Sequence, residues 1–205
     1  MTSITANKIL LVGAFSSTPD VYTYATSFYK ALQTLGYHVE AFNYRTQPLP
    51  LAGRIATYIN QRIINQQLYK QAQMFKPDLI FFIKAETITA KTIATLKQTT
   101  HAQIINFYPD NPFTFWNGNS NQEVLRALPL YDCFMSWSQA LIPALQTAGC
   151  RHVCYFPFAY DHTLFEQPIT LSPAEQEKYR SDVCFIGTWE PEREAWLGHI
   201  ITTLP

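Results

Sequence analysis

Residues 8–15, with the sequence KILLVGAF, decide the fold class of this chain. A short apolar run that carries a glycine near its end predicts a buried β-strand. Residues 20–36 follow with the apolar spacing of an amphipathic helix, which Gly36 ends. A buried strand and the helix after it form one βα unit, and a chain built from such units makes a parallel sheet.

The same alternation continues to residue 158. Further strands are expected at residues 37–44, 78–86, 102–110, 131–138 and 152–159, and further helices at residues 54–75, 88–99, 122–127 and 139–149. Strands that are apolar on both faces and separated by helices imply a parallel sheet covered on both sides. Residues 1–160 are therefore predicted to form one α/β domain, a Rossmann-like parallel sheet with helices on both faces.

The last part of the chain has a different character. Residues 161–180 form a polar connector with a short expected helix, in which Ser172 is the N-cap and Pro173 the first helical residue. Residues 181–205 repeat the strand, glycine and helix order, with DVCFIG as the strand, and predict the first βα unit of a second domain. One βα unit cannot bury its own apolar side chains. It needs a partner surface, which is the first domain, a separate C-terminal partner or the mate in a homodimer.

Composition excludes several classes of function. The chain of 205 residues has 15 basic and 15 acidic residues and no basic block, which argues against nucleic-acid binding. Its apolar runs are too short for a transmembrane segment and its N-terminus lacks a signal-peptide pattern, so a cytoplasmic location is expected. The four cysteines are scattered with no zinc-module spacing. No metal and no cofactor are predicted.

In open parallel sheets, ligands bind beyond the carboxyl ends of the strands. After the first strand, Gly13 permits a close backbone approach and Ser16 offers a hydroxyl, but the G-x-G-x-x-G spacing of a dinucleotide site is absent. The alternative is a plain loop with Asp20 as the N-cap of the helix. After the third predicted strand, Lys84 and Glu86 either meet a ligand or pair with each other at the strand end.

The segment after the fourth predicted strand, residues 106–117, has the densest combination of aromatic and polar residues. Aromatic faces beside directional polar groups suit sugars, because rings cover C–H faces while carboxylates and amides bind hydroxyls. Tyr108, Asn111 and Phe113 are therefore candidate acceptor-binding residues. Asp110 is the candidate general base, provided that burial raises its pKa. The alternative is a rigid Pro-Asp-Asn-Pro turn whose aromatic side chains belong to the core or to a domain interface.

Asp161 follows the sixth predicted strand and is a further candidate for substrate binding. It forms an acid–base pair with His162, or else it caps the next helix while His162 lies at the surface. The sequence contains no Ser-His-Asp ordering, G-x-S-x-G elbow or D-x-D metal motif, which disfavours hydrolases and metal-dependent sugar chemistry.

Several segments together resemble one family of enzymes. DLIFFIKAETI, INFYPDNPF, YDCFMSWS, YFPFAYD and DVCFIGTWEPERE, in this order, resemble the glycosyltransferases related to the spore-maturation protein CgeB, which have the two-domain GT-B fold. The resemblance covers the family's N-terminal half and the start of its second half. The later donor-binding residues of the family have no counterpart here, so weak nucleotide binding or none is expected from this chain alone.

The resemblance implies transfer of a sugar from a nucleotide-activated donor to an unknown acceptor, without an obligatory metal. It also implies that the first domain forms the acceptor side and the second holds the donor. Gly187, Thr188, Glu190 and Arg193 occupy the positions of the family's donor-binding loop. Two alternatives stay open: a non-catalytic glycan- or protein-binding module that acts with a partner subunit, and a GT-B sugar-nucleotide epimerase.

Overall fold

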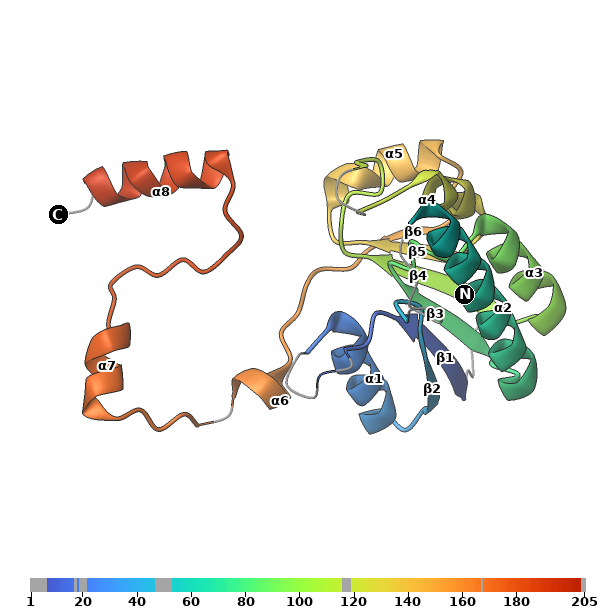
Figure 1. Cartoon of the computed structure of the whole chain (residues 1–205), viewed down its shortest axis with the longest axis horizontal. Helices are drawn as coiled ribbons and strands as arrows, with labels where there is room; N and C mark the ends of the chain where they lie inside the picture. Colours follow the sequence, from blue (N-terminus) through green and yellow to red (C-terminus); the bar gives the residue numbers. More distant parts are fainter. Residues whose placement is uncertain are drawn as a thin grey trace. The chain divides into compact units, whose positions relative to one another are not determined.

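A six-stranded parallel sheet forms the centre of the first of two units, residues 1–161 and 162–205 (Figure 1). The computed structural model describes residues 7–16, 18, 22–46, 53–115, 119–166 and 168–203. The strands are β1 (Lys8–Gly13), β2 (His38–Asn43), β3 (Leu79–Ile83), β4 (Gln103–Tyr108), β5 (Cys133–Ser136) and β6 (Val153–Tyr155). Their order is β2-β1-β3-β4-β5-β6. All six expected strands of this unit are thus confirmed.

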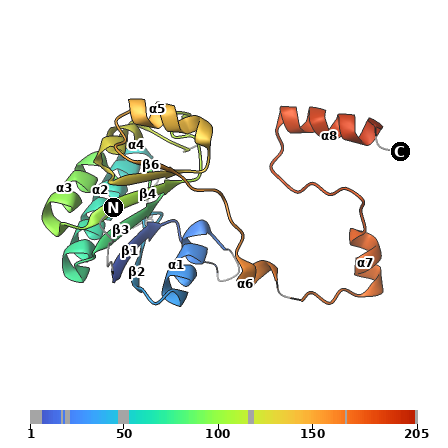
Figure 2. The same cartoon turned by 180° about the vertical axis from the view of Figure 1, so that it is seen from behind.

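Helices cover both faces of the sheet, as predicted. They are α1 (Tyr24–Thr34), α2 (Arg54–Phe75), α3 (Ala90–Thr100), α4 (Gln122–Ala127) and α5 (Ile142–Thr147), with short 3-10 turns at Leu128–Leu130 and Gln139–Leu141. Among the described helices of this unit, α1 packs on one face and α2 to α5 pack on the other (Figures 1 and 2). Thr23 caps α1 through its side chain, and the proposed cap Asp20 lies outside the described residues.

Alternation along each strand supplies two separate cores. On β1, Leu10 and Val12 point into the larger cluster beneath α2 to α5, whereas Ile9 and Leu11 point into the cluster beneath α1. All four side chains are buried. Each contributes about 1.5–3 kcal/mol to the free energy of folding, which explains why both faces of the strand had to be apolar.

The order of the strands fixes where a ligand site belongs. The chain places β2 on one side of β1 and then returns to place β3 on the other side. The connections after β1 and β3 therefore leave in opposite directions and open a crevice between the carboxyl ends of these two strands. In this sheet the crevice is bordered by Gly13 and by the residues that follow Ile83.

In the second unit, the described residues form three helices: α6 (His162–Phe165), α7 (Pro173–Tyr179) and α8 (Pro191–Thr203). The predicted N-cap is confirmed, because Ser172 and Glu175 form a capping box at α7. The strand expected at DVCFIG is not formed, since a strand needs a hydrogen-bonding neighbour and none pairs with this segment in the described residues. The unit does not bury its own Trp196 or Ile201. No helix within the described ranges combines the length and the apolar character that crossing a membrane requires.

Candidate functional site at the carboxyl edge of the sheet

Two consecutive residues with left-handed backbone follow β3. Lys84 has φ of 62° and Ala85 has φ of 60°, although neither is glycine. Such a conformation costs on the order of 1 kcal/mol or more per residue and persists only where the surroundings hold it. Here the main chain is held at Lys84, which donates its N–H to Phe107 O at 2.9 Å and whose carbonyl accepts from Asn106 Nδ2 at 3.3 Å. The turn directs the side chains of Lys84 and Glu86 to different partners.

Lys84 forms an ion pair with Asp110 across the ends of β3 and β4. Its Nζ lies 2.7 Å from Asp110 Oδ2 and 3.4 Å from Asn119 Oδ1. The Lys84 side chain is 18% exposed, whereas that of Asp110 is 37% exposed. The role of general base was predicted on the condition that Asp110 is buried, but its carboxylate is partly exposed. It is fixed by a cation on one side and still reachable from solvent.

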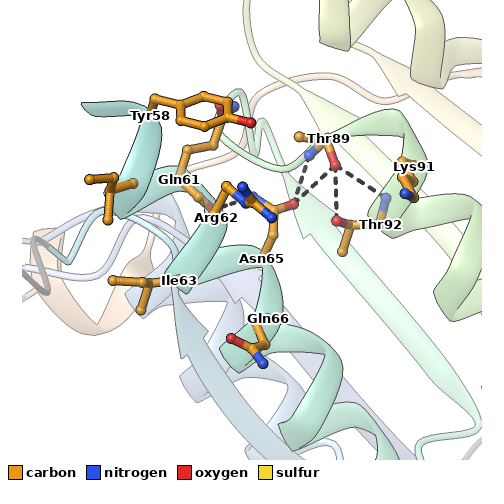
Figure 3. A pocket seen from close by; sticks show the side chains of 10 residues that line it. Tyr58, Gln61, Arg62, Ile63, Asn65, Gln66, Thr89, Lys91 and Thr92 are labelled. Carbon is orange, nitrogen blue, oxygen red and sulfur yellow. Dashed lines mark hydrogen bonds between the residues drawn. The ribbon is translucent and has the colours of Figure 1, made fainter. Parts of the chain in front are cut away.

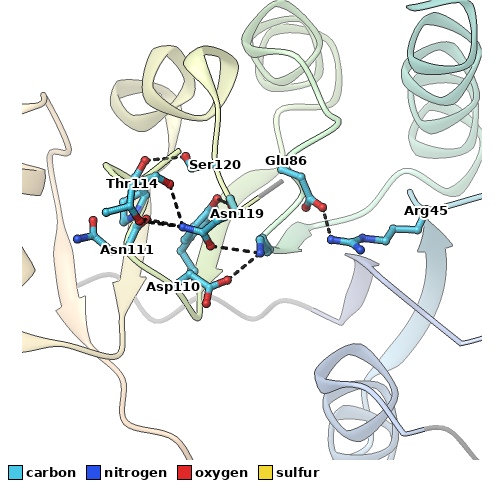
Figure 4. A network of polar contacts seen from close by, with 10 residues as sticks. Arg45, Glu86, Asp110, Asn111, Thr114, Asn119 and Ser120 are labelled. Atoms are coloured by element: carbon cyan, nitrogen blue, oxygen red, sulfur yellow. Dashed lines mark hydrogen bonds and ion pairs between the residues drawn. The ribbon is translucent and has the colours of Figure 1, made fainter. Parts of the chain in front are cut away.

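Glu86 pairs with Arg45, which directly follows β2 and Tyr44 (Figure 4). The Glu86 side chain is 10% exposed and that of Arg45 is 52% exposed. Burial, and then the Glu86 carboxylate, raise the pKa of the Tyr44 hydroxyl far above its ordinary value. Burial is the largest single influence on Arg45 and lowers the pKa of its guanidinium, but the charges and hydrogen bonds of Glu86 and Tyr44 together raise that pKa above its ordinary value. The suggestion that Lys84 and Glu86 pair with each other is wrong, since Lys84 binds Asp110 after the neighbouring strand β4 and Glu86 binds Arg45 after β2, which lies beyond β1.

The loop after β4 is held by its own polar side chains. Asn119 Nδ2 donates to Asn111 O at 2.9 Å and to Thr114 O at 3.0 Å, and Ser120 Oγ donates to Pro112 O at 2.6 Å. Asn111 Oδ1 accepts the N–H of Phe113 at 3.0 Å. Residues 111–115 and 119–120 thus form a rigid turn beside Asp110, as the alternative interpretation of this segment proposed.

Two of the candidate aromatic residues, Tyr108 and Phe113, join this turn to the core of the first unit. Tyr108 is fully buried, and its hydroxyl donates to Asn119 O at 2.5 Å. Burial raises the pKa of that hydroxyl to about 12, so it remains a protonated donor. Phe113 is partly buried against the larger core cluster, while Phe115 is exposed. Trp116 lies outside the described residues.

Gly13 and Ser16, the candidate ligand-binding residues of the loop after β1, have structural roles. A Cβ atom at Gly13 would lie 2.4 Å from Ala25 Cβ, so the glycine is needed for close packing of β1 against α1. Ser16 Oγ accepts the N–H of Thr18 at 3.0 Å within a local turn. Asn43, at the end of β2, fixes the start of the loop by donating from Nδ2 to Phe15 O at 2.8 Å.

The remaining candidates lie elsewhere in the chain. Asp161 is half-buried at the end of the first unit. In the second unit, Arg193 Nη1 donates to Thr188 O at 2.9 Å and Arg193 Nε lies 3.4 Å from Glu190 Oε2. Gly187 lies close to the ring of Phe185, to which a Cβ atom would approach within 2.7 Å. Thr188 and Glu190 therefore both contact Arg193 at the start of α8.

Sequence reasoning missed three residues of the carboxyl edge: Tyr44, Arg45 and Asn119. Tyr44 and Arg45 directly follow β2, so the rule that ligands bind beyond strand ends could have found them. Asn119 is remote from any strand end. Only the folding of the loop after β4 brings it to Lys84.

A separate groove of about 760 Å³ lies between α2 and the start of α3 (Figure 3). Several of its polar groups already have partners: Asn65 Oδ1 accepts the N–H of Thr89 at 2.9 Å, and Gln61 Nε2 donates to Thr87 O at 3.1 Å. Arg62 and Lys91 line its rim. These bonds occupy polar groups that a ligand in the groove would otherwise contact.

The arrangement at the carboxyl edge can bind and polarise a hydroxyl group. Asp110 is an anionic acceptor at the sheet edge, and Lys84 and Arg45 balance the two carboxylates. In the described part of the chain, no three His, Cys, Asp or Glu side chains are grouped so that they could hold a metal ion.

Comparison with known proteins supports the fold. No family model matches the sequence, and a search of curated proteins finds no similar sequence. The apo form of the lipopolysaccharide outer core galactosyltransferase WaaB is similar, with a TM-score of 0.50 and 10% identity over 74% of this chain and 46% of that chain. This similarity confirms the predicted fold class, α/β and Rossmann-like, as found in GT-B glycosyltransferases.

Two further solved structures are more distant. Anabaena HepE in complex with UDP-glucose gives a TM-score of 0.44 at 17% identity, over 83% of this chain and 48% of that chain. Plasmodium falciparum PdxK with ligands AMP-PNP and PL gives 0.45 at 10% identity, over 76% and 66%. The chain spans less than half the length of the WaaB and HepE chains that it matches.

Proposed function

We propose that this chain supplies the acceptor-side domain of a CgeB-like glycosyltransferase of GT-B type. The observation that carries the proposal is the Lys84–Asp110 pair, which lies at the carboxyl edge of a Rossmann-like sheet and presents a partly exposed carboxylate. The similarity of the sheet to part of a galactosyltransferase supports it. The donor is a nucleotide-activated sugar, and the acceptor carries a free hydroxyl.

In the proposed reaction, Asp110 acts as the general base. Its carboxylate accepts the proton of the acceptor hydroxyl as the hydroxyl oxygen forms a bond to the anomeric carbon of the sugar. The bond between that carbon and the nucleoside diphosphate breaks, and the electron pair leaves with the phosphate oxygen. Lys84 holds the carboxylate in place through the 2.7 Å contact. In this proposal the loop of Gly187, Thr188, Glu190 and Arg193 belongs to the donor side, and no metal ion is required.

Product analysis tests the reaction class. A form of the protein that carries both Rossmann-like domains is incubated with a panel of nucleotide sugars, with and without a panel of saccharide acceptors. The proposal predicts equal amounts of glycosylated acceptor and nucleoside diphosphate, and release of diphosphate that depends on the acceptor. An epimerised nucleotide sugar formed without acceptor would identify an epimerase instead. Binding of an acceptor without turnover of any donor would identify a non-catalytic module.

A further inference from the structure

Two cysteine side chains meet on neighbouring strands. Cys133 Sγ on β5 lies 3.3 Å from Cys154 Sγ on β6. Phe134 and Val153, which are register partners, pack into the larger core cluster. Because side chains alternate along a strand, Cys133 and Cys154 both point to the opposite face, the one on which α1 packs.

Access from solvent differs among the cysteines. Cys154 is exposed and Cys133 is half-buried, whereas Cys150 is buried. Burial, and then the neighbouring Cys154, raise the pKa of Cys133 to about 12, so this thiol stays protonated at neutral pH. Burial alone raises the pKa of Cys150 to about 11. Cys154 is therefore the member of the pair that a dissolved oxidant meets first.

We propose that Cys133 and Cys154 form a reversible disulfide when the protein meets a peroxide. Hydrogen peroxide first oxidises the Cys154 thiol to a sulfenic acid and releases one water. The sulfur of Cys133 then attacks the sulfur of Cys154, the S–O bond breaks, and the leaving hydroxide takes the thiol proton as a second water. Two thiols lose two electrons in total, and one peroxide is reduced to two waters.

The strand register defines the movement that this bond requires. Cys154 lies opposite Met135, so Cys133 and Cys154 are diagonal neighbours. Neighbouring strands lie about 4.8 Å apart and rise about 3.3 Å per residue, which separates diagonal Cα atoms by about 8 Å, whereas most disulfides join Cα atoms about 5.5–6 Å apart. The edge strand β6 must therefore shift toward Cys133. Its three residues pair with β5 alone, so the shift disturbs one strand pair.

Peptide mapping of the 205-residue protein tests the proposal. The reduced protein is treated with hydrogen peroxide, blocked with an alkylating reagent and digested with trypsin without reduction. Trypsin releases Cys133 within residues 127–151 and Cys154 within residues 152–178. We expect these two peptides to be joined, with a mass about 2 Da below their sum, and to separate on addition of dithiothreitol.

Serine variants identify the bonded pair, because Cys150 shares the first peptide with Cys133. The linked peptide should remain in Cys150→Ser and in Cys184→Ser, and should be lost in Cys133→Ser and in Cys154→Ser. Circular dichroism checks the fold of each variant, with Cys133→Ala as a replacement where serine disturbs the strand. A link that survives in Cys133→Ser, a link from Cys154 to Cys184, or oxidation of Cys154 without any link would overturn the proposal.

Discussion

The amino edge of the sheet, where its strands begin, and the carboxyl edge, where they end, use carboxylates in different ways. At the amino edge, Asp78 accepts two main-chain N–H groups at 2.9 Å, and Asp132 accepts one at 2.8 Å in addition to its ion pair with Lys97. At the carboxyl edge, Asp110 and Glu86 are held by cationic side chains. A carboxylate bonded to the main chain fixes the start of a strand. One held by flexible side chains can exchange a partner for a ligand hydroxyl, so the comparison separates structural acids from candidate functional acids.

The two edges also differ in where non-glycine residues adopt a positive φ. Four non-glycine residues of the described chain have positive φ. Lys76 and His101 end α2 and α3, where a left-handed residue commonly terminates a helix. Lys84 and Ala85 instead follow a strand, where no helix cap requires this conformation. The unusual pair therefore lies at the edge that carries the candidate site.

The largest expected effect is on catalysis. In the proposed two-domain glycosyltransferase, Asp110→Asn should lower the rate of sugar transfer by about 100-fold or more, because the proposed base is lost. Asp132→Asn is the matched control, since Asp132 is 36% exposed and pairs with Lys97 at 2.6 Å. Its rate should stay within about twofold of the wild type. Initial-rate measurements check both variants, and equal losses in the two would show that the edges do not differ in function.

A loss of stability should follow from Arg45→Ala, which leaves the buried Glu86 carboxylate without its cation. We expect the free energy of unfolding to fall by about 2–3 kcal/mol, measured by urea denaturation. The control is Arg126→Ala, since Arg126 pairs with Glu123 at the surface and should cost about 0.5 kcal/mol or less. Similar losses in the two variants would contradict the importance of burial at Glu86.

For stability, unlike for catalysis, replacing Asp132 by alanine should have a larger effect than replacing Asp110. Asp132→Ala removes the acceptor of the Ile104 N–H, which is buried, and should lower the free energy of unfolding by about 2 kcal/mol. Asp110→Ala should cost less, about 1 kcal/mol, because among the described residues Asp110 accepts from the Lys84 side chain, and Lys84 Nζ keeps Asn119 Oδ1 as an acceptor. Thermal and urea unfolding of both variants measure the difference. An Asp110 variant that is the less stable of the two would mean that this acid is structural.

The contribution of Asp78 to stability should depend on pH in the acid range. Hydrogen bonds from the main-chain N–H groups of Lys8 and Asn7 lower the pKa of this carboxyl. A lowered pKa in the folded state stabilises the protein fully above the unfolded pKa of about 3.9, and this stabilisation is lost as the pH falls through the folded value. Unfolding measured from pH 6 to pH 2 should therefore show a weaker acid dependence in Asp78→Asn. An unchanged profile would exclude this contribution.

The smallest expected effect concerns the helix end at His101. Its φ of 58° suits glycine, so His101→Gly should raise the free energy of unfolding by about 0.5–1 kcal/mol. The midpoint of urea unfolding measures this change. A loss of stability would show that the His101 side chain contributes contacts that outweigh the relief of backbone strain.

Much of the fold was predictable because its signals are local. The helix over residues 54–75 and the Ser172 cap were predicted at their observed positions. The candidate site was only partly predictable. Lys84 and Asp110 follow from the rule about strand ends, but their pairing depends on the left-handed turn at Lys84 and Ala85, which no residue type in the sequence indicates. The strand expected at DVCFIG failed because strand formation depends on a pairing partner and not on apolar pattern alone.

The most direct test of the central claim is to locate the acceptor on the first unit. Backbone amide signals of the 205-residue protein are followed by NMR while a panel of saccharide acceptors is titrated. We predict that the signals of Lys84, Glu86, Asp110, Asn111 and Asn119 shift together, and that Asp110→Asn weakens binding while Asp132→Asn does not. Shifts confined to the groove between α2 and α3, or binding that is unchanged in Asp110→Asn, would contradict a functional carboxyl edge.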